Sequence, residues 1–378
     1  MKNYKIGKVI NGYYIPYPLD KSDLESDKWS FSDMETIKLM NRASNLLGEL
    51  NGLADATPNL SNYINMFTLS EATAKSSMDG SNFSFDEFLY PESHIGTYSN
   101  RIDDWRIGLN LAKILKEIAK NRYEELDEDS LCEMHFELLK DAGRKSIDGG
   151  DYRISEVAMP EMNANACPPD NLDYEIYNVL GAEDSDGLNE LPGLAKTALM
   201  AMIFESIQPF EIESDTMTRL LITKWLMQYG LLEHPILPVF RWFNENDDDW
   251  QSALEEARSR NDAEFWVQTF MEFVCSMAYL GINMLKKARA TEVAINEKMK
   301  LLDAKKLAKA QLIMPELWEK GCISINRTME LTETSFPTAS KLLLEMEEQG
   351  IVEEWTGGTR NKEYGITGYV QMFLVFHS

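Results

Sequence analysis

The segment Phe204-Glu-Ser-Ile-Gln-Pro-Phe-Glu-Ile-Glu-Ser-Asp-Thr-Met-Thr-Arg-Leu-Leu-Ile222 joins two apolar stretches through a polar turn. Apolar residues recur at helical spacing over 194–203 and again over 217–225, which predicts two core helices. The intervening loop opens the second helix, and the N-terminus of a helix is a natural place for an anion. The loop carries three carboxylates, those of Glu211, Glu213 and Asp215. They would repel a phosphate, and this conflict is the main clue to function.

The composition is that of a soluble, acidic globular protein. The 378 residues are 44% hydrophobic and carry a formal net charge of -25, which disfavours nucleic-acid backbones and anionic membranes. The four cysteines form no CxxC pair, and the first residues lack the apolar core of a signal peptide. We therefore predict a cytoplasmic protein that makes no membrane contact. A homodimer is compatible with the sequence.

The order of patterns along the chain predicts three parts. An extended tether over 1–35 and several helices make up residues 1–101. Core helices fill 102–299, where the helical period disappears only over 149–169 in favour of a short hairpin. Residues 300–378 read as a linker helix followed by helix, turn, helix and hairpin, which is the order of a winged helix.

Taken together, the segments resemble the Fic family in its long form, with an N-terminal helical extension and a C-terminal winged helix. The family signature HPFx(D/E)GNGRxxR falls on Gln208-Pro-Phe-Glu-Ile-Glu-Ser-Asp-Thr-Met-Thr-Arg219. Gly150-Asp-Tyr-Arg153 and Cys167-Pro-Pro169 bracket the family's hairpin flap. The resemblance implies a mainly α fold, with a Fic helical core, a β-hairpin flap and a C-terminal winged-helix (α+β) domain.

The resemblance also implies an activity, transfer of AMP from ATP to a Ser, Thr or Tyr hydroxyl, with the signature histidine as general base. Here that position is Gln208, whose amide cannot accept a proton at neutral pH. The acidic residue that holds Mg²⁺ is replaced by Ile212, which cannot ligate a hard cation. The first arginine, a phosphate ligand, is replaced by Thr216. We therefore expect no useful AMP transfer.

The remaining signature positions divide in the same way. The glycine, asparagine and glycine of the anion-binding turn are replaced by Glu213, Ser214 and Asp215. Three residues agree with the signature, namely Pro209, Phe210 and Arg219. The chain thus keeps the signature residues that packing requires and lacks those that bind nucleotide. No cofactor is therefore expected. ATP with Mg²⁺ would be expected only if the chain is a transferase.

The segment from Ser70 to Gly80 is similar to the family's inhibitory (S/T)xxxE(G/N) motif. The serine position is Lys75 and the glutamate position is Asp79, which is one methylene shorter. We predict an ion pair between Asp79 and Arg219. The alternative is that Arg219 binds nearby carbonyls or Glu211.

In the family the flap pairs with an extended segment of the target by strand addition. The docking positions carried over from it are Ser155, Val157, Met159, Asn165 and Cys167. Strand addition needs only backbone groups, so this capacity can outlast the chemistry. The alternative is an ordinary surface hairpin.

The sequence predicts no metal site. The four histidines lie in separate elements without ligand spacing, so we interpret them as core or surface residues: His94, His135, His234 and His377. The acidic turn is not a calcium loop, because Ile222 stands where a bidentate glutamate would be needed.

The charges of the C-terminal unit disfavour DNA. Its recognition helix offers Lys341 against three carboxylates, and the hairpin adds two basic residues, Arg360 and Lys362. The leading hypothesis is therefore a catalytically degenerate Fic protein that binds an unidentified protein through the flap, the acidic cleft or the winged helix. One alternative is a residual transferase in which Gln208 orients the acceptor and Arg219 grips phosphate. The other is a winged-helix transcriptional regulator.

Overall fold

The computed structural model describes residues 5–17, 33–89, 95, 99–181, 191–355 and 362–373, and over these ranges it is mainly helical, as predicted. The helices are α1 (Met34–Asp55), α2 (Leu60–Met78), α3 (Ser99–Lys120), α4 (Glu128–Leu139), α5 (Leu172–Leu180), α6 (Gly193–Ile207), α7 (Ser214–Gln228), α8 (Val239–Arg260), α9 (Ala263–Met299), α10 (Ala304–Lys320), α11 (Ile325–Thr332) and α12 (Phe336–Glu348). The strands are β1 (Gly7–Ile10), β2 (Tyr13–Pro16), β3 (Ala158–Met159), β4 (Ala164–Asn165), β5 (Cys322–Ser324), β6 (Val352–Glu354) and β7 (Glu363–Ile366).

The two helices predicted around the opening segment are present, and they form the centre of the core. Almost every residue of α6 is buried, including Phe204, and so is every residue of α7 from Thr216 to Met227, including Trp225. A helix that is apolar on all sides must be surrounded by others. Here α6 packs on α5, α7 and α9, while α7 packs on α3, α6 and α8. The loop joining them is thereby held from several directions.

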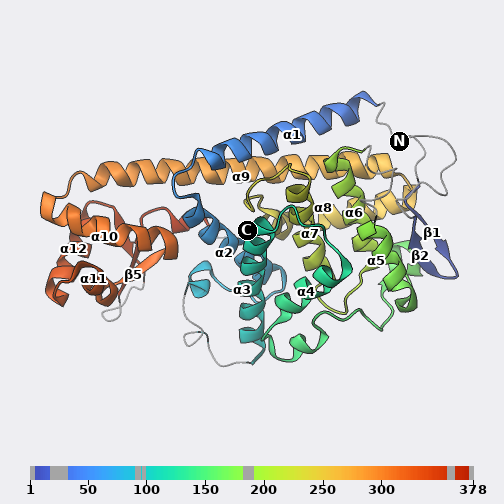
Figure 1. Cartoon of the computed structure of the whole chain (residues 1–378), viewed down its shortest axis with the longest axis horizontal. Coiled ribbons are helices and arrows are strands. Elements are labelled where there is room, and N and C mark those ends of the chain that lie inside the picture. The colour runs from blue at the N-terminus through green and yellow to red at the C-terminus, as the bar shows by residue number, and fades with distance from the viewer. Residues whose placement is uncertain are drawn as a thin grey trace.

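Helix α9 runs along most of the molecule, with α1 packed beside it (Figure 1). It is the one described helix that is long and apolar enough to cross a membrane, but 56% of its apolar window is buried inside the protein. Core helices of soluble proteins have the same property.

Helix α2 connects the parts of the molecule, because it packs against α3, α8 and α10. Its Glu71 is 1% exposed, and the carboxylate accepts hydrogen bonds from the N–H groups of Phe240 at 2.8 Å and Arg241 at 3.3 Å. These donors belong to the first turn of α8, whose N–H groups have no partner within the helix. The direction of α2, and with it the side chains near its end, is fixed relative to the core.

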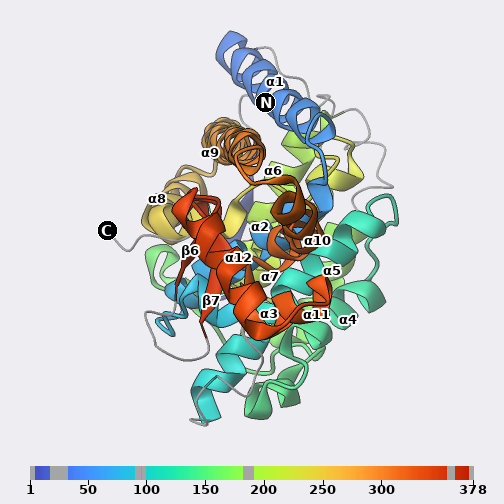
Figure 2. The same ribbon diagram turned by 90° about the vertical axis from the view of Figure 1, so that its left-hand side faces the viewer.

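The C-terminal unit has the predicted element order, and it lies at one end of α9 (Figures 1 and 2). Its three strands form an antiparallel sheet in the order β5-β7-β6, and α11 and α12 pack on each other. The tip of the hairpin, including Arg360, lies outside the described residues. That this unit works as a winged helix stays a prediction.

The first half of the tether predicted over 1–35 is extended as expected, but it is paired in a sheet and is not a free tether. Strands β1 and β2 form an antiparallel hairpin, and β2 also pairs in parallel with β4 of the flap, giving one sheet in the order β1-β2-β4-β3. The turn is Asn11-Gly12, with φ of 51° and 87°. Asn-Gly suits the two positive φ angles of a tight hairpin turn, so the signal was present in the sequence. The predicted flap hairpin itself is confirmed as β3 and β4.

Candidate functional site

The loop between α6 and α7 is bounded by two residues in the left-handed region. Gln208 ends α6 with φ 46°, and Glu213 precedes α7 with φ 62°. A non-glycine residue costs roughly 1–2 kcal/mol in this conformation. The position of Glu213 is one where the signature has glycine, so the backbone keeps a shape that its present side chain does not favour. Something must hold that side chain in place.

Lys75 holds it. The Lys75 side chain, 3% exposed, extends from the end of α2 and places Nζ 2.8 Å from Oε2 of Glu213. The same carboxylate oxygen accepts a hydrogen bond from Oγ1 of Thr216 at 2.6 Å, and Nζ also pairs with Asp79 one turn along α2. The N-terminal end of α7 therefore faces an internal ion pair.

The charges of this group follow from its surroundings. Burial by itself would lower the pKa of Lys75, but the charges of Glu213 and Asp79 outweigh it and raise the pKa above its ordinary value. For Asp79, burial and then the neighbouring charge of Glu213 outweigh the attraction of Lys75 and raise the pKa of its carboxyl. One ammonium thus serves two carboxylates, and Lys75 stays charged.

Arg219 forms a second group beside the first. Its guanidinium, 5% exposed, pairs with Asp215 at 2.8 Å and with Asp247 at 2.9 Å, and it lies over the ring of Phe243 at 4.6 Å. Burial would raise the pKa of the Asp215 carboxyl, but the charges of Arg219 and Lys75 outweigh it and lower the pKa. The predicted Asp79–Arg219 ion pair is wrong, because each residue has other partners. A kink at Asn246 in α8 precedes Asp247.

His135 contacts the loop between α6 and α7 through a hydrogen bond and a ring stack. Its Nδ1 accepts from the N–H of Gly150 at 3.1 Å, so Nε2 carries the proton and donates to the carbonyl of Ile212 at 3.1 Å. The ring stacks on Phe210, with centroids 3.8 Å apart. Burial lowers the pKa of His135, so the neutral form prevails. His135 is a core residue, one of the two environments expected for the histidines, but its contact with the signature loop was not predicted.

Arg153 joins the flap to the same loop. Nε donates to the carbonyl of Gln208 at 2.7 Å, Nη1 to that of Ser155 at 2.7 Å, and Nη2 to those of Cys167 at 2.6 Å and Ile207 at 3.1 Å. Its own N–H donates to the carbonyl of Pro209 at 2.9 Å. The planar fork of an arginine suits such a set of carbonyls. The flap is therefore rigidly placed beside the loop.

The five predicted docking residues lie along this flap, but in different environments. Ser155 is exposed and donates to Glu211 at 2.6 Å, while Val157 and Asn165 are half-buried. Met159 and Cys167 are buried, so only their backbone could meet another chain.

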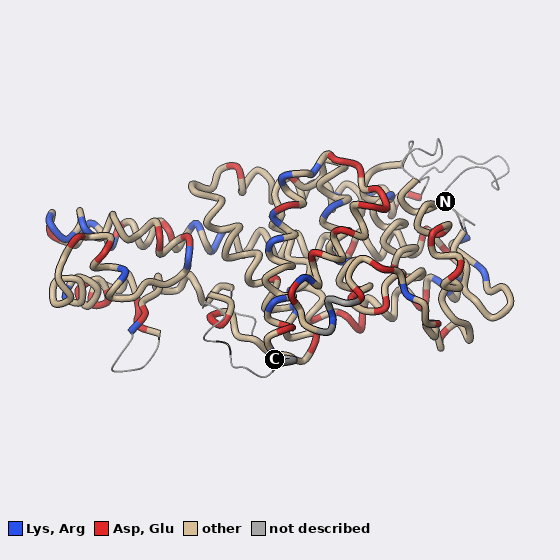
Figure 3. The backbone as a smooth tube through the Cα atoms, turned by 60° about the horizontal axis from the view of Figure 1, so that its bottom comes forward, with Lys and Arg blue, Asp and Glu red and all other residues tan. Residues whose placement is uncertain are grey.

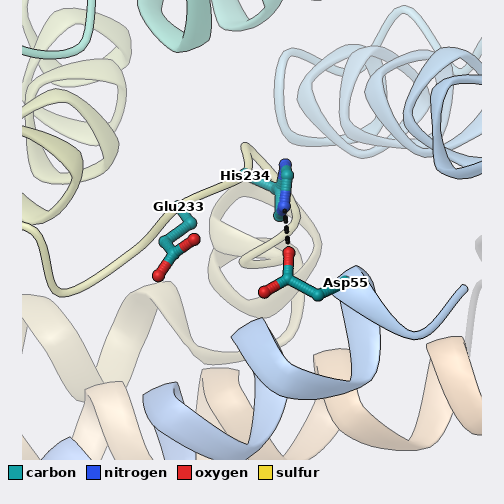
Figure 4. A group of neighbouring side chains, drawn as sticks. All are labelled: Asp55, Glu233 and His234. Atoms are coloured by element: carbon teal, nitrogen blue, oxygen red, sulfur yellow. Dashed lines mark hydrogen bonds and ion pairs between the residues drawn. The ribbon is translucent and has the colours of Figure 1, made fainter.

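A different group could in principle hold a metal. Among the described residues, Asp55, Glu233 and His234 bring three ligand atoms within 4.8 Å of one another (Figure 4). Nε2 of His234 already bonds Asp55 at 3.0 Å, and Asn51, one turn before Asp55, bonds the backbone of residues 231 and 233. Anchoring of this exposed loop on α1 accounts for the cluster without a metal. His94 and His377 lie outside the described residues.

Comparison with known proteins agrees with this architecture. Residues 37–116 match the N-terminal domain of the Fic/DOC family. A Fic family protein of Desulfovibrio desulfuricans G20 superposes with a TM-score of 0.55 over 91% of this chain and 99% of that one, at 17% identity. Fic-1 of C. elegans (residues 134–508) superposes with a TM-score of 0.52 over 66% of this chain and 73% of that one, at 15% identity. The chain has the Fic fold. No curated protein sequence matches it.

Within this Fic fold, the side chains around the loop mostly bind one another. The described side chains nearest the N-terminus of α7 are already paired with one another, and the amide of Gln208 cannot act as a base at neutral pH. Ile212 presents a carbonyl to His135 in place of a metal ligand. The two cations beside the N-terminus of α7, Lys75 and Arg219, are each paired with two carboxylates.

The C-terminal unit has few basic residues that lack a carboxylate partner. Lys306 pairs with Glu345 at 2.5 Å and Lys362 lies 4.0 Å from Glu354, while Lys341 is exposed. Figure 3 shows acidic and basic residues interspersed over this end of the molecule. Nucleic-acid binding needs a concentration of positive charge, which the described part of the unit does not offer.

Proposed function

We propose that this chain is a Fic-fold protein that does not transfer AMP and works by binding another protein. The contact between Lys75 and Glu213 carries this proposal. It fills the N-terminal end of α7, where a phosphate would have to lie, with an ammonium and a carboxylate that satisfy each other. A nucleotide could enter only if this buried pair were broken.

Electrostatics argues in the same direction. Two unit charges about 4 Å apart interact by roughly 4 kcal/mol at an effective dielectric near 20. Glu213 and Asp215 would each oppose a triphosphate on this scale. The cations that could offset them, Lys75 and Arg219, are each shared between two carboxylates. Loss of a positioned base lowers the rate of transfer by a further factor of about 10²–10⁴.

The alternatives receive less support. A residual transferase would need Arg219 to grip phosphate, yet its two terminal nitrogens bind Asp215 and Asp247. A transcriptional regulator would need a basic face on the C-terminal unit. The flap is the better candidate for an interaction surface, because it is held rigidly by Arg153 and belongs to a sheet that can accept a strand.

Calorimetric titration of the full chain with Mg-ATP tests the proposal. We expect no heat of binding, and a micromolar dissociation constant would contradict it. The companion variant Lys75→Ser/Glu213→Gly/Asp215→Gly removes the internal pair and both opposing charges; tighter binding by this variant would show that these residues exclude nucleotide.

Labelled ATP added to a lysate tests transfer directly. We expect no labelled protein that depends on the chain. A labelled band that appears with the wild-type chain and disappears with Gln208→Ala would overturn the proposal in favour of a transferase.

A further inference from the structure

The flap hairpin has two edges, and one of them is filled by the chain itself. Strand β2 lies alongside β4 in parallel, with Tyr13 opposite Asn165. The N–H of Asn165 donates to the carbonyl of Gly12 at 2.8 Å. An extended segment that pairs with a sheet edge in this way is what a docked peptide would look like.

Two side chains of β2 make specific contacts with the flap at this edge. The hydroxyl of Tyr13 donates to Glu156, whose other oxygen accepts from Nδ2 of Asn165 at 2.7 Å. The next residue, Tyr14, is 2% exposed and packs in an apolar cluster of the flap that includes Met159 and Ala166. Tyr13 is thus held by a hydrogen bond from its hydroxyl, and Tyr14 is held by burial of its ring.

The pairing is also short. A single residue pair joins β2 to β4, whereas four pairs join β1 to β2. The hairpin has a separate attachment, because Oδ1 of Asn261 accepts from the N–H groups of Ile6 at 2.7 Å and Gly7 at 3.2 Å. An incoming strand would therefore compete with one backbone bridge, the side chains of two tyrosines and the packing of β2 on α6, while Ile6 and Gly7 could stay bound to Asn261.

We propose that the β4 edge is a binding site for an extended peptide with two adjacent aromatic residues, the first bearing a hydroxyl, and that Tyr13-Tyr14 is its internal ligand. The partner takes the edge by displacing β2. This inference rests on the proposed function for the role of the flap as a docking surface, and it adds the chemistry of the partner and the step that controls its access.

Fluorescence anisotropy of a labelled peptide with the sequence of residues 11–17 tests the site on the full chain. The wild-type chain should bind weakly, because its edge is filled. Tyr14→Ala in the chain weakens the internal ligand and should tighten peptide binding about tenfold, the equivalent of one buried aromatic contact. Tyr17→Ala, a matched change in the same hairpin outside this cluster, should behave as wild type.

A peptide in which Tyr13 and Tyr14 are both replaced by alanine, with Tyr17 kept, should not compete. If the Tyr14→Ala chain keeps its helical circular dichroism but binds the peptide no more tightly than wild type, the inference is wrong.

Native-state hydrogen exchange decides the question without any variant. The N–H of Asn165 bonds to Gly12, whereas that of Ala166 bonds to Val157 within the flap. If β2 detaches from the edge, Asn165 should exchange about tenfold faster than Ala166 after correction for intrinsic rates. Equal protection would refute an exchangeable ligand. A finding that the chain transfers AMP would refute the proposed function but would not affect the peptide-binding and hydrogen-exchange results. A negative peptide-binding or hydrogen-exchange result would refute this inference but would not affect the calorimetric test of nucleotide binding.

Discussion

Nζ of Lys75 lies 2.8 Å from Oε2 of Glu213, and both side chains are almost entirely shielded from solvent. This contact joins the end of α2 to the beginning of α7. The resemblance to the Fic family implies an inhibitory glutamate at the end of α2 and an anion-binding turn in the signature loop. Here Asp79 still stands at the end of α2, but Lys75 beside it binds both Asp79 and the acidic loop. The loop thus meets a basic residue of α2 where the resemblance would place an acidic one.

Removal of Lys75 should be costly. Lys75→Met leaves Glu213 buried without a counter-ion, and loss of one partner of a buried pair typically costs about 3–5 kcal/mol. The double variant Lys75→Met/Glu213→Gln should recover most of this loss, because no uncompensated charge remains. Urea unfolding of the wild-type chain and both variants measures the effect. Lys286→Met, which breaks an exposed pair with Glu49, should change little; an equal loss there would remove the special role of Lys75.

Arg219 should couple to Asp247 and not to Asp79. A double-mutant cycle on Arg219 and Asp247 should give a coupling of about 1 kcal/mol, since Asp247 is partly exposed and solvent screens the pair. The cycle on Arg219 and Asp79 should give a value close to zero. Thermal or urea unfolding of the single and double alanine variants measures both cycles. The reverse order would restore the pair predicted from sequence.

Acidification should destabilise the loop through His135. Burial lowers the pKa of this imidazole in the folded protein. Below the ordinary histidine pKa of 6.5, the unfolded chain therefore binds more protons than the folded one. The contribution to stability is complete above pH 6.5 and is lost as the pH falls toward the lowered pKa. His135→Gln should remove this slope. The difference in unfolding free energy between the two proteins, followed as the pH falls, should therefore shrink; a constant difference would argue against it.

Glu71 should act in the opposite sense. Burial raises the pKa of its carboxyl from 4.5 to about 8, so the folded protein binds more protons there than the unfolded chain between these values. Its contribution is greatest below pH 4.5 and declines as the pH rises toward 8. Glu71→Gln should show a flatter dependence of unfolding free energy on pH. Glu49→Gln, at an exposed position, controls for the loss of one charge; parallel curves for all three proteins would refute this role for Glu71.

Much of the fold could be predicted from local patterns. The apolar periods on either side of the opening segment, the break in helical period over 149–169 and the glycine-ended helices of the C-terminal unit all correspond to observed elements. Each is a property of neighbouring residues, so tertiary context was not needed. The Asn11-Gly12 turn was equally local, and it was obscured by the prolines that follow it.

The candidate site is a different matter. The sequence alone determined the chemistry of three side chains, because the amide of Gln208 is no base at neutral pH, Ile212 has no side-chain oxygen for a cation, and Thr216 carries no positive charge. Only the tertiary structure decided where the charges went. Lys75 and Glu213 are far apart in the chain, and Arg219 meets Asp247, which follows the kink in α8. Ion pairs form between the opposite charges that the packing of helices brings within a few ångströms of each other. The spacing of residues along the sequence does not determine which charges these are.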